Sequence, residues 1–296
     1  MKKSKKILAM LLAAAAITGC FTGCGKDSSA GSGDVASKDI YVISREESSG
    51  TRGAFVELTG VEQKDADGNK VDKTVTTAEI TQSTAVMITT VQGNEAAIGY
   101  ISLGSLDKSK VKALNVDGAE ATVENVKSGA YKLARPFNIA VKEDASDAAK
   151  DFMSYILSTE GQAIVKEEGY IPLDETAPYE KSDAKGKIVV GGSSSVGHVM
   201  EAIIAEYKKI NTDVTVEINV SDSSTGMTGT IDGTLDIGMA SRELKDSELE
   251  KGLIPTQIAT DGIAVIVNKD NSINDITTEQ IMKIYTGEIT NWGDVK

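Results

Sequence analysis

The chain has 296 residues, enough for two domains, and it combines 28 glycines and many small aliphatic residues with only 4% aromatic residues, a composition typical of α/β proteins. Its formal net charge is −13, which argues against nucleic acid or an anionic membrane surface as a partner. Because the overall field of such a protein repels anions, an anionic ligand has to be captured by local, directed hydrogen bonds.

The N-terminus has the features of a bacterial export signal rather than of a folded domain. Lysines dominate the first six residues, and the apolar stretch 7–17 that follows is too short to span a membrane as a helix. The motif Ile-Thr-Gly-Cys that ends at Cys20 resembles a lipobox, so we predict a lipoprotein signal peptide at 1–19, a lipid anchor on Cys20 outside the cell, and a flexible tether at 20–38. Cys24 follows a second Thr-Gly and is the alternative lipidation site. An ordinary secretory signal with two incidental cysteines is the competing interpretation.

A short apolar run at 40–43 ends in small polar residues that can start a helix. Ser49, Gly50 and Thr51 would then lie where the first amides of a helix have no partner within it. These amides and the helix dipole attract an anion, the glycine allows a ligand to approach the backbone, and Arg45 can add a forked, charged contact. The stretch therefore indicates an anion site, with a Ser/Thr-capped surface helix as the alternative.

The middle of the chain alternates between predicted strands and helices. Apolar runs at 96–101 and 135–141 indicate strands, and the spacing of apolar residues predicts an amphipathic helix over 147–157 and a second helix over 159–168. The polar segment 172–186 then connects to the second half of the chain.

The second half repeats the strand–turn–helix pattern of the first motif twice. Runs of hydroxyl residues and glycine, at 191–198 and 221–226, each follow a β-branched strand and precede a predicted helix. Further strands are predicted at 235–240 and 261–268, and a helix over 277–285. Three such turns favour one shared anion site over three unrelated helix caps. The GxxxxGK[ST] phosphate loop does not occur in the sequence, so a nucleoside triphosphate is not the expected anion.

These turns resemble the phosphate-contacting loops of the phosphate-binding proteins that serve the phosphate ABC importer. The segment 44–52 is similar to the second-lobe loop of that family, 192–196 to its first loop, and 236–243 to a further contact region. The resemblance covers nearly everything after residue 38. It implies an α/β protein with the two-lobed, type II-like periplasmic-binding-protein fold and a hinge of two strands.

The order of the blocks differs from that of the family. There, the block that resembles 187–296 comes first and the block that resembles 40–175 follows, so this chain is interpreted as a circular permutation. A fragment of a tandem array would look similar. Permutation is tolerated where termini lie close together at the surface. The resemblance then implies one lobe made of 39–133 plus 259–296 and another made of 134–258.

The resemblance also implies which residues contact phosphate. A guanidinium and several hydroxyls and amides would surround the anion, and the family can carry an aspartate near Ser241 that accepts the phosphate proton. Here Ser241 is followed by Arg242, so Glu46, Glu47 and Asp222 are considered as replacements, although each is expected on the solvated surface. The predicted ligands are Arg45, Ser49, Gly50 and Thr51 from one lobe and Ser194, Ser195, Ser223 and Ser241 from the other.

The implied function is that of a monomeric extracytoplasmic receptor, which captures inorganic phosphate between its lobes and delivers it to the permease subunits of the importer. Neither a cofactor nor a nucleic-acid partner is expected. A receptor for sulfate or molybdate and a phosphate sensor without transport are the alternatives. A phosphoester-acting enzyme is disfavoured. The S-x-x-K match at Ser182–Lys185 lacks its partner motifs, the sole histidine, His198, adjoins an anion loop, and no His or Cys cluster offers a metal site.

Overall fold

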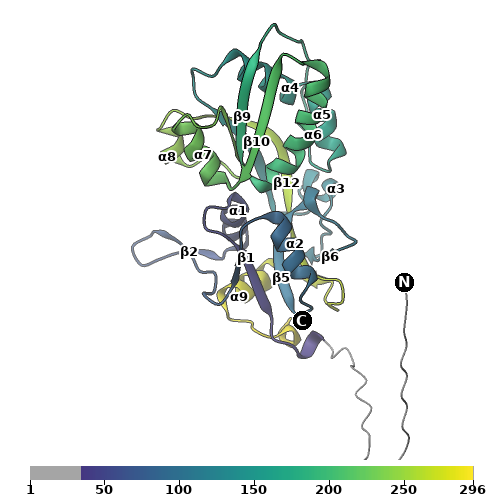
Figure 1. The fold of residues 1–296 in the computed structure, drawn as a ribbon. Coiled ribbons are helices and arrows are strands. Elements are labelled where there is room, and N and C mark those ends of the chain that lie inside the picture. The colour runs from purple at the N-terminus through teal and green to yellow at the C-terminus, as the bar shows by residue number, and fades with distance from the viewer. Residues whose placement is uncertain (1–34, 296) are drawn as a thin grey trace, which may run out of the picture. The chain divides into compact units, whose positions relative to one another are not determined.

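The computed structural model describes residues 35–295, which form a mixed nine-stranded sheet with flanking helices (Figure 1). The strands lie in the order β10-β9-β11-β8-β12-β5-β1-β4, and β6 pairs with β12. Neighbours toward both ends of this order are parallel, whereas every pair that includes β8 or β12 is antiparallel. The strands of this sheet are β1 (Tyr41–Arg45), β4 (Glu79–Thr81), β5 (Ala97–Ser102), β6 (Val111–Ala113), β8 (Ala134–Val141), β9 (Gly186–Ser193), β10 (Val214–Ser221), β11 (Ile237–Ala240) and β12 (Ile254–Asn268).

Several helices begin after a residue whose hydroxyl or carboxylate side chain caps the first turn of the helix. Ser49, Ser83 and Asp222 each accept a hydrogen bond from a first-turn amide of the helix that follows, as capping residues do. The helices are α1 (Gly50–Thr59), α2 (Thr84–Gln92), α3 (Val123–Lys127), α4 (Asp147–Leu157), α5 (Thr159–Glu167), α6 (Ser194–Ile210), α7 (Ser223–Ile231), α8 (Asp246–Leu249) and α9 (Thr278–Thr286), with a 3-10 turn, η2 (Leu103–Ser105). Two small ribbons pair β2 (Glu62–Lys64) with β3 (Lys70–Asp72) and β7 (Asn115–Val116) with β13 (Asp275–Ile276).

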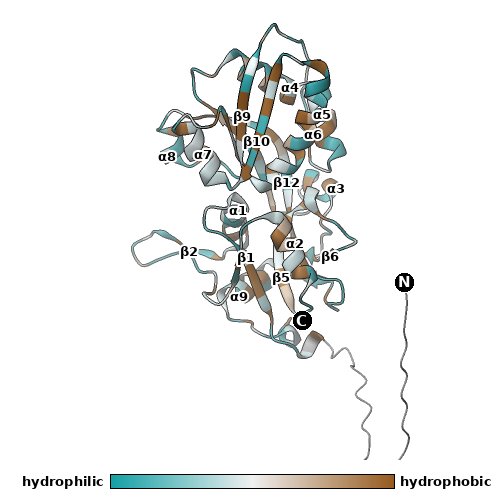
Figure 2. Cartoon of the chain, in the orientation of Figure 1, coloured by the Kyte–Doolittle hydropathy of each residue, from teal (hydrophilic) through white to brown (hydrophobic). Residues whose placement is uncertain are grey.

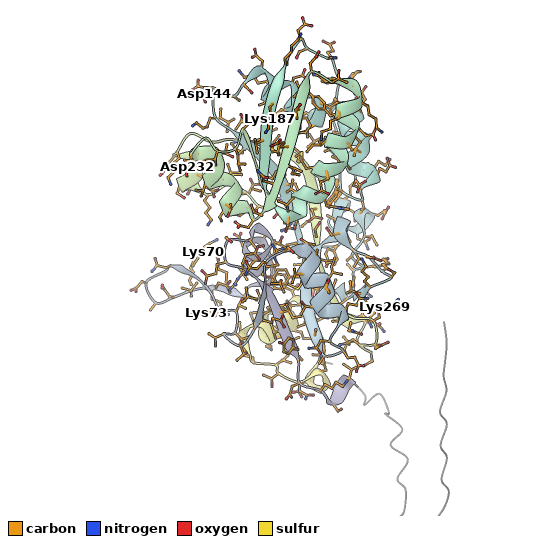
Figure 3. All side chains as sticks on the ribbon, viewed as in Figure 1. Lys70, Lys73, Asp144, Lys187, Asp232 and Lys269 are labelled. Carbon is orange, nitrogen blue, oxygen red and sulfur yellow. The ribbon has the colours of Figure 1, made fainter. Side chains whose placement is uncertain are left out.

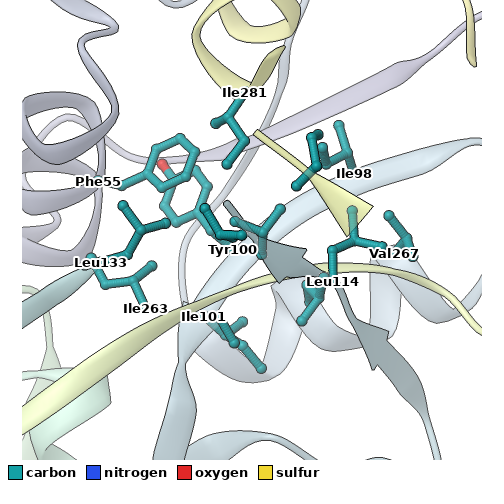
Figure 4. Close-up of a cluster of buried hydrophobic side chains, with 14 of the residues drawn as sticks. Phe55, Ile98, Tyr100, Ile101, Leu114, Leu133, Ile263, Val267 and Ile281 are labelled. Carbon is teal, nitrogen blue, oxygen red and sulfur yellow. The ribbon is translucent and has the colours of Figure 1, made fainter. Parts of the chain in front are cut away.

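Two large hydrophobic clusters lie on different parts of this sheet. The first, here called the Tyr100 core, combines Phe55 of α1, Tyr100 of β5 and Ile281 of α9 (Figure 4). The second, the Tyr207 core, combines Phe152 of α4 with Tyr207 of α6. Apolar residues concentrate along the strands of both (Figure 2). Each part thus buries a core of its own, and the sheet joins them.

The longest strand, β12, belongs to both parts of the fold. Its first half pairs with β8, from Ile254 opposite Val141 to Gly262 opposite Ala134, and its second half pairs with β5 and β6. Residues of β12 therefore enter both cores, Ile258 in one and Ile263 in the other. The register shifts between Gln257 and Ala259, a local irregularity of the kind that bends a strand.

The predicted signal peptide and most of the predicted tether, including Cys20 and Cys24, lie outside the described residues. Within 35–295, no helix is both long enough and apolar enough to cross a bilayer.

Candidate functional site

Four helix N-termini converge on one cluster of hydroxyl groups, here called the hydroxyl cluster. Its members are Thr51, Thr84, Ser193, Ser194, Ser195, Ser223 and Ser241. Helices α1, α6 and α7 start directly after β1, β9 and β10, as the sequence predicted, and α2 starts at Thr84. Strands β9 and β10 are parallel, with Ser193 opposite Ser221, so the helices that follow them start side by side. The first amides of each helix lack intrahelical partners, and together with the helix dipoles they favour negative charge at this point.

Hydrogen bonds between hydroxyls link the first turns of these helices. Thr51 Oγ1 of α1 lies 3.0 Å from Ser195 Oγ of α6, and both side chains are almost fully buried. Thr84 Oγ1 of α2 lies 3.4 Å from the hydroxyls of both Ser194 and Ser195. Helices that belong to the Tyr100 core, α1 and α2, thereby contact helix α6 of the Tyr207 core.

Three further serines complete the cluster. Ser193 is the last residue of β9, Ser223 is the first residue of α7, and Ser241 directly follows β11. Ser193 Oγ donates to Ser241 Oγ at 3.0 Å, and the amide of Ser241 donates to Ser223 Oγ at 3.1 Å. Gly50, the first residue of α1, packs against them so closely that a Cβ there would lie 2.3 Å from Ser223 Oγ. Only glycine fits at position 50 in this arrangement.

Arg45 is the only guanidinium with a hydrogen bond to the predicted serines of this cluster among the described residues. It is 2% exposed, and its Nη2 lies 3.3 Å from Ser194 Oγ. Its Nε and Nη2 also donate to the two carboxylate oxygens of Glu46, at 2.8 and 2.6 Å. The surface position expected for Glu46 is wrong, because the forked pair with Arg45 compensates the carboxylate and allows its burial. Glu47 is exposed, as expected.

Tyr100, which stacks on Phe55, holds the backbone around Arg45 in place. Tyr100 Oη lies 2.8 Å from Ser44 Oγ and accepts from the amide of Arg45 at 3.0 Å, and its ring stacks on Phe55 with centroids 3.9 Å apart. Burial raises the pKa of Tyr100 to about 12, so the phenol stays neutral. Arg52 donates to the carbonyl of Arg45 at 2.7 Å, which fixes the loop from the other side.

The eight predicted residues lie close together in the structure. The hydroxyl of Ser49, however, is used differently from the prediction. Ser49 uses its hydroxyl to cap α1 by accepting from the amide of Arg52 at 3.3 Å, and its own amide donates to the carbonyl of Glu46. Its main role in this structure is therefore to shape the loop. Sequence reasoning missed Thr84 and Ser193. Ser193 stands next to Ser194 in the hydroxyl run at 191–198, whereas no residue beside Thr84 was singled out.

A buried ion pair joins the two strands that link the cores. Arg135 of β8 and Asp261 of β12 are register partners, both almost fully buried, with Nη2 3.1 Å from Oδ2. Ser102 donates to the other carboxylate oxygen at 2.9 Å. Burial raises the pKa of Asp261, and the attraction of Arg135 opposes that shift. This pair stiffens the junction, since breaking it would leave a buried charge without a partner.

The fold and the converging helix N-termini define a class of protein, the solute-binding proteins with a periplasmic-binding-protein fold. Residues 10–160 and 177–296 match the family model described as a PBP superfamily domain. A phosphate-binding protein PstS 2 of Streptococcus agalactiae is 52% identical over 100% of this chain and 99% of its own length. A solved phosphate-binding protein of a phosphate ABC transporter from Streptococcus pneumoniae is 46% identical, covers 88% of this chain and 100% of its own, and superposes with a TM-score of 0.69. The chain belongs to the phosphate-binding protein family of the PBP superfamily.

The relatives match this chain over different lengths. The protein of S. agalactiae aligns from end to end. In contrast, the phosphate-binding protein PstS of Staphylococcus saprophyticus is 36% identical over only 39% of each chain.

Proposed function

We propose that this protein is the extracytoplasmic receptor of a phosphate ABC importer, which binds one inorganic phosphate at the hydroxyl cluster and passes it to the permease subunits. One observation carries the proposal. Hydroxyl groups from four helix N-termini, together with the guanidinium of Arg45, meet where helices of the two cores contact each other. Neutral donors around one fixed cation suit a small tetrahedral oxyanion. The relatives named as phosphate-binding proteins support the same choice of anion.

In this proposal the ligand contacts come from both parts of the fold. Arg45, Gly50 and Thr51 approach the anion from the side of the Tyr100 core, and Ser49 shapes their loop. Serines of α6, α7 and β11 approach it from the other side, and they are Ser194, Ser195, Ser223 and Ser241. Binding then favours the closed arrangement of the two parts, because only that arrangement presents all donors to one ligand.

Glu46 is proposed to distinguish phosphate from sulfate. It is the carboxylate bonded to Arg45, and it is 8% exposed. At neutral pH phosphate carries a proton that a carboxylate can accept, whereas sulfate carries none and would be repelled. Glu46 therefore takes the place that the resemblance gave to an aspartate near Ser241.

The cellular setting follows from the same proposal. We propose lipidation at Cys20, with Cys24 as the alternative, so that a monomeric receptor is tethered to the outer side of the cell membrane. A binding role without catalysis agrees with the names of the relatives.

Isothermal titration with phosphate, arsenate, sulfate and molybdate tests the proposed ligand. We expect tight, one-to-one binding of phosphate and arsenate and no measurable heat with sulfate. Binding of sulfate or molybdate in preference to phosphate would assign the site to another oxyanion. Hydrolysis of a phosphoester by the purified protein would instead support an enzyme.

A further inference from the structure

A small cavity lined by lysines lies apart from the hydroxyl cluster, beside β6. It has a volume of about 260 Å³, and its charged lining residues are Lys108, Lys112, Lys269 and Glu120. Cavities that bind larger organic ligands start at about 300 Å³, so this one suits a small ligand. Three ammonium groups against one carboxylate contrast with the formal net charge of −13 of the chain. We call this cavity the lysine pocket.

The positive charge of the lysine pocket is only partly neutralised by the described residues. Lys112 donates to the main-chain oxygen of Asn271 and, at 3.1 Å, to Oδ1 of Asn274. Lys269 donates to the main-chain oxygen of Ser109 at 3.3 Å. These acceptors carry no charge. Burial lowers the pKa of Lys112, as expected for an ammonium group that loses water without gaining a counter-ion. Within 35–295 the ion pair of the pocket is that of Lys108, 3.4 Å from Glu120.

Among the described residues, a buried donor without an acceptor belongs to Asn271, the residue whose main-chain oxygen accepts from Lys112. Asn271 is 2% exposed, and its Nδ2 is buried without a hydrogen-bond partner in the described part of the chain. Its Oδ1 is occupied, since it accepts from the amide of Ile273 at 2.9 Å. A buried donor without a partner loses its hydrogen bonds to water without replacing them, which destabilises the fold. Lys112 contacts the main-chain oxygen of this same residue, so an ammonium group without a carboxylate partner and an amide group without an acceptor, both judged within 35–295, occur in neighbouring residues at the pocket.

We propose that the lysine pocket is a second anion site, which takes one phosphate-sized oxyanion and binds it more weakly than the hydroxyl cluster does. Lysine is a point-charge binder of phosphate groups, and Lys112 and Lys269 both have charge to offer. Lys269 lies at the edge of the part of the fold that contains β6 (Figure 3). The phosphate group can belong to free inorganic phosphate or to the headgroup of an anionic lipid.

The position of Lys108 links the lysine pocket to the hydroxyl cluster. Lys108 also lines a groove of about 780 Å³ between α2 and α6, whose lining includes Thr84 and Ser194. Asp107 and Glu201 also line this groove, so the attraction of anions toward the cluster depends on the positive pocket beside it. The second site therefore attracts anions locally, whereas the negative net charge of the chain repels them.

Equilibrium dialysis of the full chain against radiolabelled inorganic phosphate, from micromolar to 20 mM at low ionic strength, tests the proposal. The variant is Lys112→Met with Lys269→Met, and the control is Lys166→Met with Lys208→Met, which removes two exposed lysines elsewhere. We expect wild type and control to bind a second phosphate at millimolar concentration. The variant should lose this second phosphate, keep the tight one, and associate with phosphate at least 3-fold more slowly at low salt.

Flotation with phosphatidylglycerol vesicles forms the second arm. The site is assigned to a lipid headgroup if two results are obtained together. The control binds vesicles and the Lys112/Lys269 variant does not, and dialysis shows no second phosphate on the wild-type protein. Equal stoichiometry and equal vesicle binding in all three proteins overturn the proposal. A wild-type protein that binds the weak phosphate but no tight one would support the lysine pocket and reject the phosphate-receptor function. The failure of one proposal can therefore be told apart from the failure of the other.

Discussion

Thr51 and Ser195 are 144 residues apart in the chain, yet their hydroxyl oxygens lie 3.0 Å from each other. One belongs to a helix of the Tyr100 core and the other to a helix of the Tyr207 core. Each stands one residue inside its helix, where the backbone amides have no intrahelical partner. This pair therefore identifies the contact between the two parts of the fold as the place where donors from both accumulate.

Arg45→Ala should weaken phosphate binding by about 2 kcal/mol or more, roughly 30-fold, because it removes a buried charged partner of the ligand. Titration calorimetry measures the change. The same substitution leaves Glu46 buried without its partner, so Arg45→Ala with Glu46→Gln serves as the control for folding. Unchanged phosphate affinity in a folded variant would show that Arg45 is no ligand.

Glu46→Gln should reduce discrimination against sulfate. The amide keeps the shape of the carboxylate but removes the negative charge that would repel a fully ionised oxyanion. We expect the ratio of phosphate to sulfate affinity to fall by at least 10-fold in competition experiments. Glu47→Gln, at an exposed neighbouring position, is the matched control and should leave the ratio as in wild type.

Gly50→Ala should weaken ligand binding while the fold is kept. A methyl group at position 50 would lie 2.3 Å from Ser223 Oγ and 2.9 Å from Ser241 Oγ, so these two predicted ligands have to shift from their positions. We expect at least a 10-fold loss of phosphate affinity. Gly53→Ala, in the same helix, would place its methyl group 4.0 Å from Arg242 and gains the same helix propensity. Equal affinity of both variants would contradict the close approach described here.

Asp151→Asn should destabilise the Tyr207 core. Asp151 accepts hydrogen bonds from Tyr179 at 2.7 Å, Tyr207 at 2.5 Å and Asn211 at 3.0 Å. Burial alone would raise the pKa of Asp151, but hydrogen bonds, among them those of Ser182 and the two tyrosines, lower it to about 2. We expect a loss of about 2 kcal/mol in the free energy of unfolding at pH 7, the size of hydrogen bonds to a charged group.

The pH dependence of this loss checks its cause. A carboxylate whose pKa is lower in the folded state stabilises the protein above the unfolded value of 3.8, and this contribution is lost as pH falls through about 2. Denaturant unfolding should therefore show the full difference between wild type and Asp151→Asn at pH 7 and a smaller one at pH 3. A difference that is constant with pH would point to packing instead of charge.

Local patterns in the sequence predicted the elements of the site, and tertiary contacts decided the rest. The turns after β1, β9 and β10 were predicted because strand residues, hydroxyls and glycine follow one another directly along the chain. The burial of Glu46 was not, because two consecutive acidic residues in a polar turn give no sign of which one the rest of the fold covers. Thr84 escaped for the same reason, since its partners lie 110 and 111 residues away.

The junction between the cores shows the same limit. The apolar run around Arg135 predicted a strand, but nothing in it indicated that Arg135 would face Asp261 across the neighbouring strand. Such a pair arises from the register of two strands that are far apart in sequence. The exchanged order of the blocks stays a prediction from the motifs, since each motif keeps its own signature wherever its block stands.

The hydroxyls of the cluster bond to one another in this structure, through Thr51, Ser195, Ser193 and Ser241. A hydroxyl can donate and accept, so these groups stay satisfied when no ligand occupies the site. Each of these hydroxyls therefore contributes to the strength of the complex only the difference between two satisfied states, unlike the first amides of the helices, which have no partner within the helix. A binding protein with such a site can bind its ligand tightly and still release it when a transporter contributes only a small part of the binding free energy.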